Sequence, residues 1–296
     1  MSTLIVRARR DPAVALWAVA GTCWAGTVWL VLAGGGEQGH HDLVLEHDGW
    51  PSAVSVAAFL AVWLVMVGAM MLPTVVPLIR AFVPVSARAP RPAAARLAVL
   101  AGYVAVWTAF AVAALLVALG VHVLVEGWPW LAARPGLVLG AALVLAGAFQ
   151  FSSLKGACLT ACRSPVEVLW RNYRRGVAGG LRLGLRHGVS CLGCCWALML
   201  VMVGTGVGSL AWMIGLTAAM VVEKTSRWGV RLVVPLGVAL LAAGATATVS
   251  ALVAPVEHAG HGHGGPDLVV LLVAVVVLTA VLPRPPARRA GSTSEV

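Results

Sequence analysis

Five of the six cysteines lie in two short segments whose spacing is that of a helix face. The first segment carries two of them, and the second carries three that follow a histidine: Cys158, Cys162, His187, Cys191, Cys194 and Cys195. Thiolates select soft metals such as Cu(I), and imidazole and thiolate together also suit zinc. In an apolar chain, clustered side chains of this kind mark a functional site. The two segments therefore predict a soft-metal site.

The second segment places its ligand-type side chains on one side when it is taken as a helix. His187 precedes Cys191 by one turn, and Cys194 and Cys195 follow after a further turn. At about 100° per residue, these positions occupy a stripe roughly 100° wide. One face of a single helix therefore presents three thiols and an imidazole.

The first segment has the same logic on a smaller scale. Cys158 and Cys162 are four residues apart, so both sulfurs project from one side of a helix. Pro165 lacks an amide hydrogen and predicts the end of that helix. If the two cysteine helices pack as neighbours, their thiols come within reach of one another.

Methionine and glutamate supply further candidates. Met66 and Met70 are one turn apart and Met71 adjoins them, and thioether sulfur also favours Cu(I), so we treat the three as auxiliary ligands. Glu223 is followed by Lys224 at the end of an apolar segment. Glu223 either pairs with that lysine or accepts a hydrogen bond from a ligating histidine.

Composition predicts the class of protein that holds these residues. The chain has 296 residues, of which 60% are hydrophobic and 11% charged, whereas soluble domains carry about 25% charged residues. Apolar stretches of about 20 residues cross a bilayer as helices. We predict an all-α, polytopic transmembrane helical bundle with about eight spans, at residues 13–33, 54–79, 97–124, 136–153, 187–206, 208–222, 231–253 and 267–282.

Lysine and arginine placement predicts the orientation. With both termini inside, 20 of the 21 basic residues fall in inner segments and only Arg134 falls outside. This is the positive-inside pattern of a multi-pass protein of the plasma (inner) membrane, and it argues against a nucleic-acid partner for the net charge of +10. Both cysteine segments then lie near the inner surface, where a reducing environment disfavours a structural disulfide.

The chain is expected to form one unit. Residues 1–282 are predicted to be a single transmembrane domain in contact with lipid, with a long basic inner loop at about 154–186. Residues 283–296 are proline-rich and basic, which is typical of a disordered cytoplasmic tail.

Six of the eight histidines fall in two predicted outer loops: His40, His41, His47, His258, His261 and His263. Short histidine-rich tracts bind metals weakly, and a solvated loop is the alternative interpretation. His122 and Glu126 are one turn apart at the outer end of the third span and are candidates to join such a site.

Two longer motifs contain these cysteines, one from Gln150 to Pro165 and one from Gly184 to Met199. Together with the runs at 66–73, 212–213 and 223–224, they resemble a bacterial family of predicted metal-binding integral membrane proteins of unknown function. Some members are described as copper chaperones serving tyrosinase-type enzymes. The resemblance covers about residues 55–225. It implies Cu(I) as cargo and a protein partner that receives it. Some relatives carry a histidine in the first motif where this chain has Thr160 and Ala161, so its coordination differs if that histidine is a ligand.

Three functions fit these patterns. The first is a copper chaperone that holds Cu(I) through clustered Cys and His for delivery to a partner. The second is a secondary soft-metal transporter, since no ATP-binding motif is present. The third is a membrane thiol redox protein that uses Cys191 and Cys194. Packing alone would also place cysteines in the interior. No motif of a hydrolytic enzyme is present, so we expect no enzymatic activity. The sequence leaves the oligomeric state open.

Overall fold

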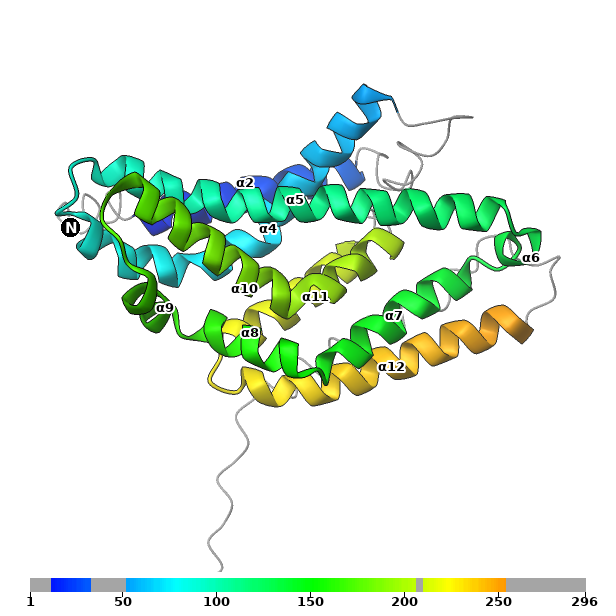
Figure 1. Cartoon of the computed structure of the whole chain (residues 1–296). Coiled ribbons are helices and arrows are strands. Elements are labelled where there is room, and N and C mark those ends of the chain that lie inside the picture. Colours follow the sequence, from blue (N-terminus) through cyan, green and yellow to red (C-terminus); the bar gives the residue numbers. More distant parts are fainter. Residues whose placement is uncertain (1–11, 33–51, 206–209, 254–296) are drawn as a thin grey trace, which may run out of the picture.

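The computed structural model describes residues 12–32, 52–205 and 210–253, and these ranges consist of helices joined by short turns (Figure 1). Within them no strand occurs, which confirms the all-α prediction. The helices are α2 (Pro12–Leu30), α4 (Ala53–Ser86), α5 (Pro92–Glu126), α6 (Pro129–Ala132), α7 (Gly136–Gln150), α8 (Ser153–Arg163), α9 (Pro165–Asn172), α10 (Gly176–Thr205), α11 (Leu210–Thr225) and α12 (Gly229–Val253).

Five of the described helices are long and apolar enough to cross a membrane: α2, α4, α5, α10 and α12. A sixth crossing arises if α7 and α8, which meet at a bend of 67°, form one broken span. The predicted sixth span at 208–222 corresponds to α11, which has only 16 residues. The predicted eighth span at 267–282 and the tail at 283–296 lie outside the described residues. The structure therefore supports five or six apolar crossings in the described ranges, while the predicted count of eight stays a prediction.

The predicted inner loop at 154–186 is mostly helical in the structure, while its inner location stays a prediction. It contains α8, α9 and the first turns of α10, which begins at Gly176 rather than near residue 187. Gly176 has a φ of +85°, a conformation that glycine adopts without strain. An argument based on the length of apolar stretches does not detect α9 and the first turns of α10, because these segments contain polar residues. His187 therefore lies well inside α10 rather than at its start.

Glycines on α10 allow unusually close packing against α5. A Cβ at Gly180 would overlap the carbonyl of Ala95, and one at Gly184 would overlap the carbonyl of Val99. Gly102 on α5 meets α10 in the same way, at Leu181. Small residues at such contacts let helix backbones approach each other. The close approach places the buried face of α5 directly against the cysteine stripe of α10.

A second close pair lies on the other side of the molecule, where α7 and α12 run side by side (Figure 1). Gly140 and Gly147 on α7 face Gly244 and Gly237 on α12 with little room for a side chain. This pair anchors α7, and the bend after Gln150 then directs α8 towards α10.

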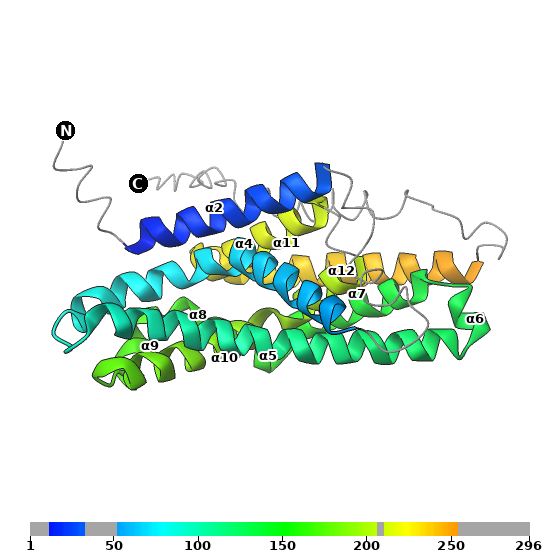
Figure 2. The same ribbon diagram turned by 90° about the horizontal axis from the view of Figure 1, so that it is seen from above.

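The helices α4 and α11 complete the surroundings of the cysteines. Viewed from above, α4 lies between α2 and α5 (Figure 2). It continues through Pro73, Pro77 and Pro84, and its buried residues include Met66, Met70 and Met71. The shorter α11 packs against α4, α8, α10 and α12. The C-terminal ends of α8 and α11 and the middle of α10 therefore converge on one buried region.

Candidate metal centre

The two cysteine helices pack against each other, a contact that the sequence left open. The sulfurs of Cys162 on α8 and Cys194 on α10 are 3.8 Å apart. Cys158 packs on the backbone of α10, where a Cβ at Gly193 would come within 2.5 Å of its sulfur. The helix α8 ends at Arg163, two residues before Pro165, as predicted. Thiols from two helices therefore share one interface.

Cys191 is the most highly connected thiol of this interface. Its sulfur lies 3.1 Å from the hydroxyl of Tyr103 and 3.9 Å from that of Thr74. Its carbonyl accepts hydrogen bonds from the thiols of Cys194 at 3.0 Å and Cys195 at 2.9 Å. All three cysteines are at most 1% exposed. Residues from α4, α5 and α10 thus meet at one sulfur.

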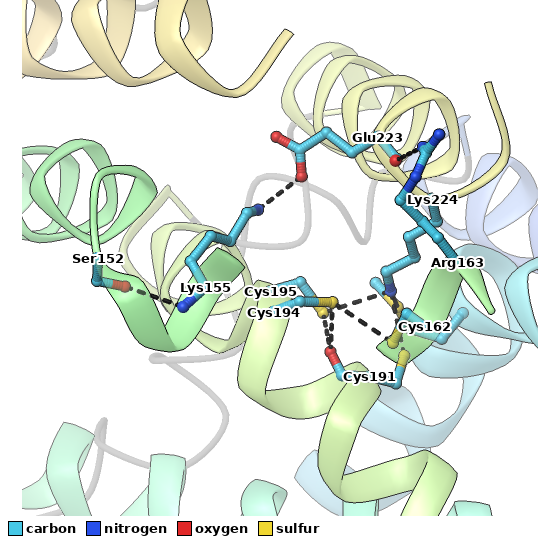
Figure 3. Close-up of polar contacts among 10 residues, drawn as sticks. Ser152, Lys155, Cys162, Arg163, Cys191, Cys194, Cys195, Glu223 and Lys224 are labelled. Atoms are coloured by element: carbon cyan, nitrogen blue, oxygen red, sulfur yellow. Dashed lines mark hydrogen bonds and ion pairs between the residues drawn. The ribbon is translucent and has the colours of Figure 1, made fainter. Parts of the chain in front are cut away.

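Lys224 lies among these sulfurs, which the sequence did not predict. Its ammonium is 3.1 Å from the sulfur of Cys191, 3.6 Å from that of Cys195 and 3.6 Å from the thioether of Met71 (Figure 3). Lys224 is buried, with 7% of its surface exposed. The signal in the sequence was a lysine next to Glu223 at the end of an apolar segment, since charged residues in such segments mark functional positions in a membrane protein.

Glu223 pairs with a different lysine from the one next to it in the chain. Its carboxylate accepts a hydrogen bond from the ammonium of Lys155 at 2.6 Å, and both side chains are 1% exposed. Arg163 donates to the backbone carbonyl of Glu223 (Figure 3). Both contacts join α8 to α11. Glu223 thus lies beside the cluster and connects α8 to α11. Its other carboxylate oxygen has no hydrogen-bond partner among the described residues.

His187 is buried at 2% exposure, one turn before Cys191. Its ring stacks on that of Tyr103, with centroids 5.9 Å apart and an angle of 29° between the planes. Its Nδ1 has no hydrogen-bond partner among the described residues. A buried polar atom without a partner is costly, and an imidazole nitrogen in this state is free to act as a ligand.

The predicted auxiliary methionines lie in the interior. Met66, Met70 and Met71 are each at most 1% exposed, and Met71 directly contacts Lys224. The structure therefore brings one thioether of the three into the thiol cluster.

Among the described residues, no group of three or more His, Cys, Asp and Glu side chains is arranged to hold a metal ion as it stands. The thiols of Cys194 and Cys195 are directed at their own helix backbone. The sulfur of Cys194 also lies 3.8 Å from that of Cys162 on α8. The donor set consists almost entirely of sulfur, which fits Cu(I) better than harder ions.

The candidate metal ligands of the predicted outer side are not brought together with the thiol cluster among the described residues. His122 and Glu126 form an exposed ion pair of 3.0 Å on α5. The six histidines of the two outer loops lie outside the described residues.

Comparison with known proteins agrees with this chemistry. No curated protein and no solved structure matches the chain. A family model described as "PpoB2: Copper chaperone" matches residues 60–247, a range that contains His187, Lys224 and the five cysteines of the centre. The chain belongs to the PpoB2 copper chaperone family.

Proposed function

We propose that this protein is a membrane-embedded copper chaperone that holds Cu(I) between α8 and α10. The observation that carries the proposal is the 3.8 Å separation of the Cys162 and Cys194 sulfurs, which belong to different helices. A soft ion that binds both sulfurs joins two structural units, and Cys191 adjoins them. His187 is a further ligand available on the same stripe of α10.

The exposure of the thiols gives the cluster a direction. Cys158 is partly exposed, Cys162 is 9% exposed, and Cys191, Cys194 and Cys195 are at most 1% exposed. An ion that arrives from outside the bundle therefore meets Cys158 first. In the proposed sequence of events, Cys158 receives Cu(I) and the buried thiols retain it until a partner takes it.

Lys224 supports the same function through its charge. Thiolates are the metal-binding form of cysteine, and two thiolates on one Cu(I) leave a net negative charge. Buried charges need a partner. The ammonium of Lys224, 3.1 Å from Cys191, supplies it.

The surface of the bundle supports a membrane location. Large apolar side chains point outward along the long helices, for example Leu97 at 66%, Leu116 at 63% and Val189 at 59% exposure. Lipid is the environment that accommodates such a surface. We therefore place the protein in the plasma (inner) membrane. We also propose that it catalyses no reaction. A protein partner would receive its Cu(I).

The test is Cu(I) binding by the detergent-purified protein under reducing conditions, measured by competition with a Cu(I) chelator. We expect Cys162→Ser and Cys194→Ser each to weaken binding strongly. The control is Cys23→Ser, since Cys23 lies on α2 against Gly68, away from the cluster. Equal affinity of all three variants and the unchanged protein would refute the proposal.

The same pair of sulfurs favours thiol redox activity as a second candidate. Two sulfurs 3.8 Å apart need only a small approach to form a disulfide. The redox function requires a reversible Cys162–Cys194 disulfide, which is detected by differential alkylation after mild oxidation. Full alkylation after oxidation would reject this second candidate and leave the copper function standing.

A further inference from the structure

The methionines of this protein are distributed unlike its other large apolar residues. The chain has eight, and every one in the described ranges is at most 1% exposed: Met66, Met70, Met71, Met199, Met202, Met213 and Met220. They all lie on α4, α10 and α11. Leucine, isoleucine and valine on the same helices also face outward, as Ile214 does at 55% exposure next to Met213. The thioethers are thus confined to the three helices that meet at Lys224.

The contact between Lys224 and Cys191 sets the register of α11 on α10. The helix α11 begins five residues after Thr205, the last residue of α10, and its Lys224 reaches back to Cys191, so the two helices run in opposite directions. Met202 follows Cys191 by eleven residues, and Met213 precedes Lys224 by eleven. At 1.5 Å per residue, both methionines therefore lie about 16 Å beyond the thiol cluster, at the same height.

The side chains also share the correct faces. Eleven residues are close to three helical turns, so Met202 projects from the Cys191 side of α10 and Met213 from the Lys224 side of α11. Met220 lies on that same side of α11, one turn before Lys224 in the chain. Met199, by contrast, is rotated by about 80° from Cys191 on α10. A seam of sulfur therefore continues from the thiols towards the connection between α10 and α11.

We propose that Met202 and Met213 form a second, thioether site for Cu(I), which connects to the thiol cluster through Met220 and Met71. Thioethers are neutral, so they leave the charge of Cu(I) uncompensated and hold it more weakly than thiolates do. A weak site next to a tight one provides a step along which the ion moves away from the thiols. The choice of ion rests on the proposed copper function, but the site itself does not require the thiols.

The experiment removes the thiols and looks for the remaining sulfur site. The full-length protein with all six cysteines replaced by serine is titrated with Ag(I), a redox-inert soft cation, and its helix content is checked by circular dichroism. We expect Ag(I) to bind, and Met202→Leu and Met213→Leu to abolish this binding. Leucine conserves the volume of methionine closely, so the core stays packed. Met199→Leu is the matched control and should retain binding.

Each outcome decides the matter. No Ag(I) binding by the folded cysteine-free protein would overturn the thioether site, and so would an equal loss in Met199→Leu. Cu(I) binding by the unchanged protein is measured in parallel. If that binding persists while the thioether site fails, the copper function stands alone. If the unchanged protein binds no Cu(I), the proposed function fails by its own measurement.

Discussion

The ammonium of Lys224 lies 3.1 Å from the sulfur of Cys191, at the point where α4, α10 and α11 meet. A lysine at this depth is costly unless its charge interacts with acceptors, and here three sulfurs from two other helices surround it. The arrangement couples the position of α11 to the thiols of α10. It also makes Lys224 part of the candidate centre although it is not a ligand type.

Replacing Lys224 by methionine tests its role as a counter-charge. The substitution keeps an apolar stem but removes the cation, so a buried copper–thiolate complex loses its compensation. We expect Cu(I) affinity to fall by roughly 10–100-fold, the range found for groups that support metal ligands. Competition with a Cu(I) chelator measures it. Arg227→Met removes an exposed positive charge from the following turn and should leave affinity unchanged. Tighter binding in Lys224→Met would show that the ammonium competes with the metal instead.

Gly193 tests the contact between the two cysteine helices. A Cβ at Gly193 would lie 2.5 Å from the sulfur of Cys158, so Gly193→Ala must displace that thiol or the whole of α8. We expect slower uptake of Cu(I), because Cys158 is the accessible thiol of the cluster. Stopped-flow transfer from a Cu(I) donor measures this rate. Gly156→Ala on α8 is the control, since nothing lies within 4 Å of its added methyl group. Equal rates in both variants would remove Cys158 from the entry route.

The pair formed by Lys155 and Glu223 is expected to stabilise the fold. Both groups are 1% exposed, so Lys155→Met leaves a buried carboxylate without its partner. Breaking a buried pair from one side costs about 3–5 kcal/mol. We expect a clear drop in the free energy of unfolding, and partial recovery in the double variant Lys155→Met with Glu223→Leu.

A surface pair provides the comparison for this measurement. Glu167 and Arg171 form an ion pair on α9 with most of their side-chain surface exposed. Glu167→Gln should change stability by at most about 1 kcal/mol. Chemical unfolding in detergent measures all variants. A similar loss for Glu167→Gln and Lys155→Met would contradict the assignment of the buried pair.

Gly184 tests the close approach of α5 and α10. An added methyl group would overlap the carbonyl of Val99, so Gly184→Ala should separate the helices and move Tyr103 away from Cys191. We expect a lower melting temperature and weaker Cu(I) binding. Gly120→Ala on α5 meets no atom within 4 Å and should be as stable as the unchanged protein or more so. Unchanged melting of Gly184→Ala would mean that the two helices separate without cost.

The sequence was most informative where one helix carries the pattern. The stripe from His187 to Cys195, the pair Cys158 and Cys162, and the break before Pro165 follow from helical spacing alone, and the structure has all three. Contacts between helices were harder to predict. Tyr103 and Lys224 join the cluster only because α5 and α11 pack on α10, and nothing in their own segments identifies that packing. The helix α9 and the first turns of α10 were not predicted, because these segments are shorter and more polar than the apolar spans.

The bend of 67° between α7 and α8 divides the thiols between two bodies. Cys158 and Cys162 belong to an eleven-residue helix that is attached at its ends by Ser152 and Ser164. The other three belong to α10, which is locked to α5 along its glycines. A rotation of α8 would change the sulfur–sulfur distances, and it would also disturb the contacts of Lys155 and Arg163 with Glu223 on α11. If the protein holds Cu(I) as proposed, a movement of this one short helix would be enough to change the distances between the two groups of thiols.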